Sequence, residues 1–194
     1  MKATTAKLGR RGAAVRAAVL EATLVELVDH GIEGVTVAAV AARAGVHETS
    51  VYRRWRTRDD LIVDALLERS ATQIPVPDTG SLRGDLIELA RRVIGYLSSR
   101  IGRALVRMST LIVEEQSLDQ ARANFLASRL AATRVVVDRA VERGELPADT
   151  DAGLVLEMLV APLHLRTIMT GEPLTDDLPE QLVDILLDGL LPRG

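Results

Sequence analysis

The chain has 194 residues, of which 47% are hydrophobic and 26% charged, and it contains no cysteine. That length supports one or two compact domains with cores of their own, and the composition is ordinary for a soluble globular protein. The lack of cysteine excludes disulfides, a thiolate nucleophile and a Cys-ligated metal site. No apolar run approaches the roughly 20 residues that a membrane span needs, and the basic N-terminus has no apolar segment of signal-peptide type. We therefore expect a cytoplasmic protein.

The formal net charge of −3 is unevenly divided along the chain. Residues 1–58 carry ten Lys and Arg against five Asp and Glu, whereas residues 59–194 carry 14 against 22. A basic N-terminal part on an acidic remainder predicts a polyanionic partner for the N-terminal part alone. The alternative is a chance fluctuation in charge, which the motif within residues 35–61 makes less attractive.

Apolar residues recur with the period of a helix throughout, and neither strand alternation nor a hairpin turn signal is present. The pattern predicts an all-α chain of nine helices. They cover residues 12–30, 37–44, 48–55, 58–71, 82–100, 103–116, 118–143, 151–170 and 177–191. Segment 73–80, with two prolines and a glycine, is the clearest break, and Pro162 should kink the eighth helix or break its hydrogen bonds locally. We expect a smaller domain over residues 1–57 and a larger one over 58–194.

Residues 35–61 read VTVAAVAARAGVHETSVYRRWRTRDDL and form a motif of two short helices around a tight turn. Thr36 is placed to cap the first helix, and Gly45 is the residue expected to turn the chain with a positive φ. With Val51 pointing inward, the outer face of the second helix carries short polar groups, a phenol and guanidinium groups. Such a face suits a helix that lies in a nucleic-acid groove, so the motif predicts a helix-turn-helix.

The chemistry of the outward residues divides them into two groups. Tyr52, Thr36 and Ser50 can donate to phosphate oxygens, and Arg58 lies at a helix N-terminus, where phosphate is favoured. Arginines suit a guanine edge or a phosphate, whereas a glutamate or threonine can read other base edges. The candidate DNA-binding residues are Thr36, His47, Glu48, Thr49, Ser50, Tyr52, Arg53, Arg54 and Arg58.

Four of the residues in the motif also have purely structural interpretations, and the first is Tyr52, which can belong to the core or its rim. Trp55 is expected to be a packing anchor rather than a base contact. Glu48 can serve simply as a favourable acid in the first turn of a helix. His47 can act as a weak N-cap.

The motif resembles the DNA-binding segment of the tetracycline-repressor-like (TetR) regulators. The positions that carry the resemblance are Thr36, Val40, Ala41, Ala44, Gly45, Val46, Val51, Tyr52, Trp55 and Leu61. Three positions depart from the family pattern: His47 replaces a Ser or Thr, Trp55 replaces a Phe, and Arg58 replaces a Lys. The match is tight over residues 12–61 and loose elsewhere.

The resemblance implies a three-helix DNA-binding domain joined by the fourth helix to a larger helical domain that binds a ligand and dimerises. The implied function is a sequence-specific transcriptional regulator, with repression favoured, that binds a pseudo-palindromic operator as a dimer and is released by a small-molecule effector. Two alternatives stay open: a non-specific DNA-architectural protein and a helical interaction module.

The last two predicted helices, the eighth and ninth, indicate how the dimer forms. Residues 151–170 are apolar nearly all round, and residues 177–191 carry a wide apolar stripe. Paired with their copies, these helices can form a four-helix interface with two-fold symmetry. The alternative is an ordinary buried core.

The resemblance also implies an effector pocket within the fifth to eighth helices. Its candidate lining residues are Leu97, Arg100, Met108, Leu111, Phe125, Arg129, Leu159 and His164. Because this part of the chain has only Tyr96 and Phe125 as aromatic residues, we expect a largely apolar effector held with little ring stacking. A lone histidine such as His164 is more often a core residue than a ligand contact.

An enzyme is the rival class, and the sequence does not favour it. The three histidines are scattered along the chain, and neither a phosphate-binding loop nor a metal-ligand spacing is present. We therefore expect a protein without catalytic residues, cofactor or bound metal.

Overall fold

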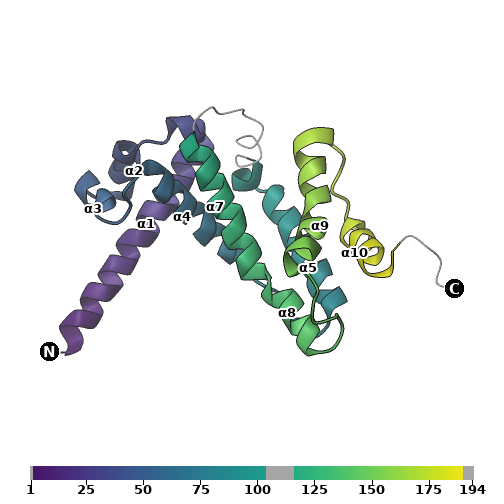
Figure 1. The fold of residues 1–194 in the computed structure, drawn as a ribbon. Helices are drawn as coiled ribbons and strands as arrows, with labels where there is room; N and C mark the ends of the chain where they lie inside the picture. The colour runs from purple at the N-terminus through teal and green to yellow at the C-terminus, as the bar shows by residue number, and fades with distance from the viewer. Residues whose placement is uncertain (1, 104–115, 190–194) are drawn as a thin grey trace. The chain divides into compact units, whose positions relative to one another are not determined.

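The computed structural model describes residues 2–103 and 116–189, with side chains over residues 12–103 and 123–189. Every regular element within these ranges is helical, as predicted (Figure 1). The elements are α1 (Lys2–Gly34), α2 (Val37–Ala44), α3 (Glu48–Tyr52), α4 (Arg58–Gln73), α5 (Leu82–Leu97), α7 (Gln116–Thr133), α8 (Val135–Glu142), α9 (Ala152–Leu165), the π-helical turn η1 (Arg166–Thr170) and α10 (Leu178–Asp188). The helix predicted over 103–116 lies almost wholly outside the described residues.

The N-terminal helix is longer than the sequence pattern predicted. Helix α1 begins at Lys2 rather than near Gly12, but its helical geometry is broken where expected, at Gly31, which has a φ of 70°. Glycine adopts this left-handed conformation without the steric cost that a Cβ would bring.

The single helix predicted over residues 118–143 is divided at Arg134 into α7 and α8. The hydroxyl of Thr133 donates to the carbonyls of Arg129 and Leu130, at 3.0 and 3.1 Å. A threonine that bonds back to the preceding turn competes with the backbone ladder and bends a helix. The division therefore arises from a side-chain hydrogen bond and not from a glycine or proline.

Helix α9 continues through Pro162 and changes only afterwards, into the π-helical turn η1, which ends at Gly171 with a φ of 68°. Proline lacks the N–H that the preceding turn requires, so the ladder is interrupted without ending the helix. The hydroxyl of Thr167 also donates to the carbonyl of Leu163 at 2.7 Å, which adds a second disturbance in the same turn.

The segment Ala152–Thr170 also corrects the expectation about apolar runs. By length and composition alone it could cross a membrane, and 22% of it is buried within this chain. It nevertheless includes the polar residues Glu157, His164 and Arg166. Its exposed large apolar residues are Leu154, Met158, Leu165 and Met169.

The chain divides into two compact units, which we call the first and the second unit. The first comprises residues 1–69 and 112–125, and the second comprises residues 70–111 and 126–194. In the first unit α2 packs on α1 and α3 packs on α2. Its buried core includes Leu24, Leu27, Val35, Val40, Ala41, Val51, Trp55, Leu61, Ile62 and Ala65.

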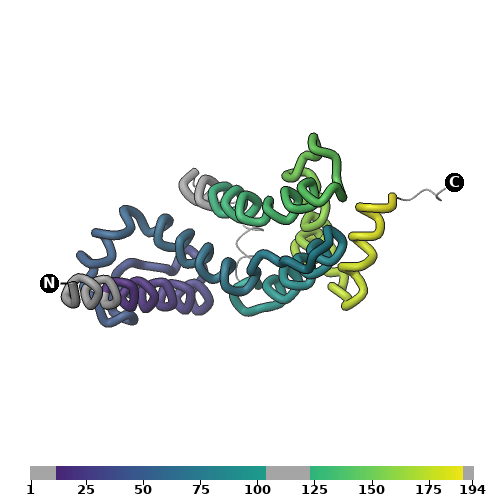
Figure 2. Tube along the Cα trace, turned by 90° about the horizontal axis from the view of Figure 1, so that it is seen from below, coloured from purple at the N-terminus to yellow at the C-terminus, as the bar shows by residue number. Residues whose placement is uncertain are grey.

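In the second unit α5 is the central helix. It contacts α8, α9 and α10, and α10 also packs on α9. Figure 2 traces these helices along the chain. Nearly every apolar side chain of α5 is buried, together with one carboxylate, Asp85. The same cluster takes in Val136 from α8, Leu156 and Leu163 from α9 and Val183 from α10.

Candidate nucleic-acid interface

The turn of the helix-turn-helix forms as the sequence predicts. Thr36 caps α2, its hydroxyl oxygen accepting from the N–H of Ala39 at 3.1 Å. Gly45 ends the helix in the left-handed conformation, with φ 68° and ψ 34°, and its N–H bonds back to the last turn. Val40 and Val51 are buried on the inner faces of the two helices. The turn is therefore set by a cap, a glycine and a small apolar contact surface, all of them local.

Helix α3 presents a polar outer surface. Glu48, Thr49, Tyr52 and Arg53 are all exposed, and Ser50 is half-buried. Tyr52 is 51% exposed. A large aromatic side chain is usually this exposed only where it serves a function at the surface. These residues form the outward face that the sequence predicted, so we call Glu48, Thr49, Tyr52 and Arg53 the recognition face.

His47 stands at the N-cap position of α3, but its side chain makes no capping hydrogen bond. The first turn is closed instead by the backbone, with the N–H of Ser50 donating to the carbonyl of His47 at 2.9 Å. The interpretation of His47 as a weak cap is therefore wrong, and its exposed imidazole lies beside the recognition face.

Arg54 is placed differently from Arg53. Its guanidinium donates to the carbonyl of Gly12 in α1 at 3.1 Å and lies 5.9 Å from the centre of the Trp55 ring. These contacts turn Arg54 back toward α1, so it must leave them before it can reach a base or a phosphate. Among the residues that the structure describes, none contacts the side chain of Arg53 through a hydrogen bond or an ion pair.

Trp55 is the anchor that fixes the end of α3. It is 6% exposed, as expected for a packing residue, and its indole N–H donates to Oδ2 of Asp64 in α4 at 2.9 Å. The other oxygen of Asp64 accepts from Arg16 in α1 at 2.7 Å, and Arg16 also pairs with Glu68 at 3.0 Å. The hydrogen bond that Arg16 donates to Glu68 and the pairing with Asp64 raise the pKa of Arg16. Asp64 thus joins α1, α4 and the end of α3.

The start of α4 carries the predicted capping box. The N–H of Asp60 donates to the hydroxyl of Thr57 at 3.0 Å, and the N–H of Thr57 donates to the Asp60 carboxylate at 3.2 Å. Arg58 is half-buried and pairs with Asp59 at 3.2 Å. Its charge is therefore partly balanced before any phosphate approaches, which the sequence did not predict.

A second ion pair, missed by sequence reasoning, holds α2 against α1. Glu26 is 5% exposed and accepts from Nε of Arg43 at 2.6 Å, with His30 at 3.5 Å. Arg43 also lies 3.8 Å from Asp29. The sequence did contain a signal for this pair, because Glu26 lies on the apolar stripe of its helix. A buried carboxylate needs a partner.

The residues expected to line an effector pocket have varied surroundings where the structure describes them. Leu97 and Leu159 belong to the core of the second unit. Arg129 is half-buried and donates to the carbonyl of Ile74 at 3.0 Å, and burial lowers the pKa of its guanidinium. The ring Nδ1 of His164 lies 2.9 Å from the carbonyl of Val160 in its own helix.

The remaining pocket candidates are less informative. Arg100 is exposed, and Phe125 is half-buried and belongs to the first unit. Met108 and Leu111 lie outside the described residues. Across the side chains that the structure describes, no group of three His, Asp or Glu residues could hold a metal ion.

Two family models match the chain. One, described as bacterial regulatory proteins of the tetR family, matches residues 19–65, which contain the helix-turn-helix. The other, described as a tetracyclin repressor-like C-terminal domain, matches residues 76–186.

Curated relatives cover nearly the whole chain. The HTH-type transcriptional regulator AqdR of Rhodococcus erythropolis is 36% identical over 179 residues, which are 92% of this chain and 86% of that protein. The DNA-binding transcriptional repressor TetR of Mycobacteroides abscessus is 33% identical over 188 residues, covering 95% and 97% of the two chains.

Solved structures share the fold. The TetR family transcription regulator SCO0332 superposes with a TM-score of 0.79 at 28% identity, over 92% of this chain and 99% of that one. FadR from Bacillus subtilis, solved in complex with stearoyl-CoA, superposes with a TM-score of 0.65 over 90% and 99% of the two chains. At 15% identity the FadR likeness concerns the fold alone. With its capped helix-turn-helix and its matches over both domains, the chain belongs to the TetR family of helix-turn-helix transcriptional regulators.

Proposed function

We propose that the chain is a repressor that binds a pseudo-palindromic operator as a homodimer and is released by a small, largely apolar effector. The observation that carries this proposal is the recognition face. It is exposed on a short helix whose inner side is fixed by Val51 and Trp55. A rigid scaffold under an exposed polar surface is what precise docking into a groove requires.

The side chains of this surface have distinct proposed roles. Arg53 reads a guanine edge, and Glu48 and Thr49 read neighbouring bases, because their polar atoms suit groove contacts. Tyr52, Ser50 and Thr36 bind phosphate oxygens, with His47 and Arg58 beside them at the N-termini of α3 and α4. Arg54 contributes only after release from Gly12.

The proposed dimer interface lies on the surface of α9, η1 and α10, the predicted eighth and ninth helices. The exposed apolar residues there are Leu154, Met158, Leu165, Met169, Ile185 and Leu187. Met169 is 77% exposed, a costly position for an apolar side chain in water. A second copy of the same helices, related by a two-fold axis, would cover this surface with its own apolar residues.

Helix α4 is the proposed lever between effector and DNA. It runs without interruption from Arg58, beside the capping box, to Gln73, at the start of the linker. An effector in the second unit needs only to favour one of two conformations that differ in the separation of the two recognition helices. Such a regulator acts in the cytoplasm and has no catalytic step.

Selecting bound duplexes from a random pool tests the proposal. We expect an inverted repeat whose half-sites lie about one helical turn, roughly 34–36 Å, apart. A pool that binds tightly without enrichment, and with a steep dependence on salt, would identify the architectural alternative. The interaction-module alternative predicts no binding to any duplex.

The base-reading role has its own test, with a matched control. Arg53→Ala should weaken operator binding relative to random DNA by roughly 1–3 kcal/mol, the size of one good base contact. Arg56→Ala removes a neighbouring exposed charge and should weaken both DNAs equally. Equal losses for Arg53→Ala on both DNAs would contradict base reading. Tyr52→Phe should lower affinity for all sequences alike.

The dimer surface is tested by sedimentation. Met169→Glu places a charge on the exposed apolar surface of η1 and should shift the protein to monomers at micromolar concentration, while α3 stays folded. Val15→Glu alters another exposed apolar residue, 36% exposed and on α1, and should leave the dimer intact. A monomeric wild-type protein would contradict the interface.

A further inference from the structure

The linker between α4 and α5 is held by side chains rather than by its own backbone. Pro75 and Pro77 lack N–H groups, so the segment cannot continue the helix and has few backbone donors of its own. Three of its carbonyls instead accept from guanidinium groups. Ile74 accepts from Arg129 at 3.0 Å, Pro75 from Arg92 at 2.6 Å and Pro77 from Arg139 at 3.1 Å.

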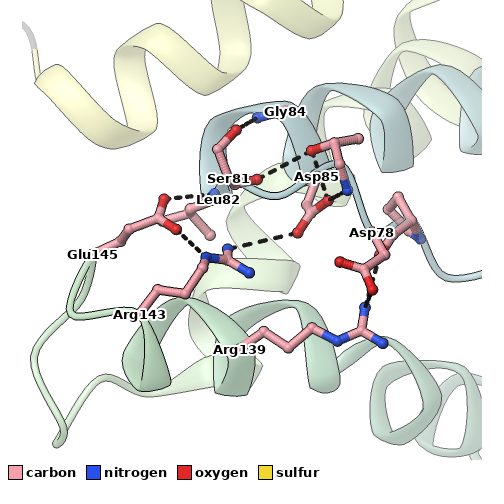
Figure 3. Close-up of polar contacts among 10 residues, drawn as sticks. Asp78, Ser81, Leu82, Gly84, Asp85, Arg139, Arg143 and Glu145 are labelled. Carbon is pink, nitrogen blue, oxygen red and sulfur yellow. Dashed lines mark hydrogen bonds and ion pairs between the residues drawn. The ribbon is translucent and has the colours of Figure 1, made fainter.

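The three arginines lie in the second unit, each on a different helix. Arg92 lies on α5, Arg129 on α7 and Arg139 on α8. Arg139 also pairs with Asp78 of the linker at 3.5 Å, the contact at the right of Figure 3. We call Arg92, Arg129 and Arg139 the linker clamp.

The end of the linker is fixed by a second set of contacts. Asp85 is 0% exposed, and one of its oxygens accepts from the backbone N–H and the hydroxyl of Thr79, at 2.6 and 2.8 Å. Its other oxygen faces Arg143 at 3.8 Å. Arg143 pairs with Glu145, and Glu145 accepts from the N–H of Leu82 at 2.6 Å, as Figure 3 shows. The linker is thus held from Ile74 to the first residue of α5.

Arg129 indicates that the clamp is more than a set of surface contacts. Its guanidinium is half-buried, and loss of water lowers its pKa. Among the side chains that the structure describes, no carboxylate pairs with it. A cation placed at this cost against a neutral carbonyl fixes the position of that carbonyl closely, because arginine offers a rigid planar set of donors.

We propose that the linker clamp couples the conformation of the second unit to the direction of α4. Arg92, Arg129 and Arg139 are then positioning residues for operator binding. Ile74 follows directly on the last residue of α4, so the clamped carbonyl and the end of that helix move together. With the clamp intact, the direction of α4 follows α5, α7 and α8. With the clamp released, the linker becomes a flexible joint. This inference rests on the proposed binding of a dimer to paired half-sites.

Spacing selectivity is the readout that separates positioning from mere stability. Operator duplexes are made with the selected half-site spacing and with one base pair added or removed, and a duplex with a single half-site serves as the reference. The wild-type protein should prefer one spacing. Arg92→Gln, Arg129→Gln and Arg139→Gln should each lower this preference by about tenfold, as expected for losing one hydrogen bond to a charged group. Affinity for the single half-site should not change.

Arg134→Gln is the matched control, since Arg134 lies between two clamp residues and pairs only weakly with Asp138, at 3.5 Å on the surface. It should keep the wild-type spacing preference, and Arg139→Lys should restore part of it. Circular dichroism checks folding, and should Arg129→Gln fail to fold, Arg92→Gln and Arg139→Gln carry the test.

Two outcomes would overturn the clamp: an unchanged spacing preference in the folded variants, or an equal loss in Arg134→Gln. A wild-type protein that selects no paired half-sites would instead overturn the proposed function, which is a distinguishable result.

Discussion

Asp64 offers the sharpest test of how the recognition helix is held. Replacing it by alanine removes the acceptor for the indole N–H of Trp55, a side chain that is 6% exposed. Leaving a buried donor unsatisfied costs about 1–3 kcal/mol. The pair with Arg16 is roughly one-third exposed on both sides and adds about 0.5 kcal/mol after solvent screening. We therefore expect Asp64→Ala to lower the free energy of unfolding by about 1.5–3.5 kcal/mol.

Urea unfolding measures this change directly, because Trp55 is the sole tryptophan of the chain and its fluorescence reports on this site. Asp64→Asn keeps an oxygen that can accept from the indole, so it should lose only about 1 kcal/mol. Glu68→Ala removes the more exposed partner of Arg16 and should cost about 0.5 kcal/mol or less.

This role of Asp64 is contradicted if the free energy of unfolding of Asp64→Ala lies within about 0.5 kcal/mol of the wild-type value and its emission spectrum is unchanged. Burial of the indole alone would then hold the end of α3. The same variant should also bind its operator more weakly, since Arg53 and Tyr52 lie within three residues of the anchor.

Two further predictions concern the turn and the linker. Gly45→Ala should destabilise the protein by about 1–2 kcal/mol, since φ is 68° there and a Cβ meets no other atom, so backbone strain is the whole effect. An unchanged melting temperature would mean that the turn relaxes. The bond from Leu82 and then the pair with Arg143 lower the pKa of Glu145 below its ordinary value of 4.5. Its contribution to stability should therefore be complete above pH 4.5 and fade as pH falls further, so the wild type and Glu145→Gln should converge in acid melts.

Local signals account for the parts of the fold that the sequence predicted correctly. The cap at Thr36, the glycine turn and the capping box at Thr57 each act within a few residues, so their residue types alone specify them. The burial of Trp55 followed from its chemistry in the same way. The outward direction of Arg53 followed from the helical period.

The contacts that were missed join residues far apart in sequence. Arg43 and Glu26 are 17 residues apart, Arg16 and Asp64 are 48 apart, and Arg129 and Ile74 are 55 apart. No periodic pattern encodes such pairs, because a charged residue on a helix surface reads the same whether or not a partner reaches it. The contact of Arg54 with α1 was not predicted for this reason, since its partner is a backbone carbonyl.

The hydrogen bond between Trp55 and Asp64 also has a consequence for the evolution of this branch of the family. The resembling regulators usually have phenylalanine at this position, which has no N–H to donate. Tryptophan adds a donor at a site that is 6% exposed, and the acceptor is a side chain on another helix. Among relatives, tryptophan at position 55 should therefore occur together with an acidic or amide residue at position 64. In relatives with phenylalanine at position 55, the residue at position 64 should vary freely. Wherever tryptophan and phenylalanine replaced each other at position 55, position 64 should have changed as well.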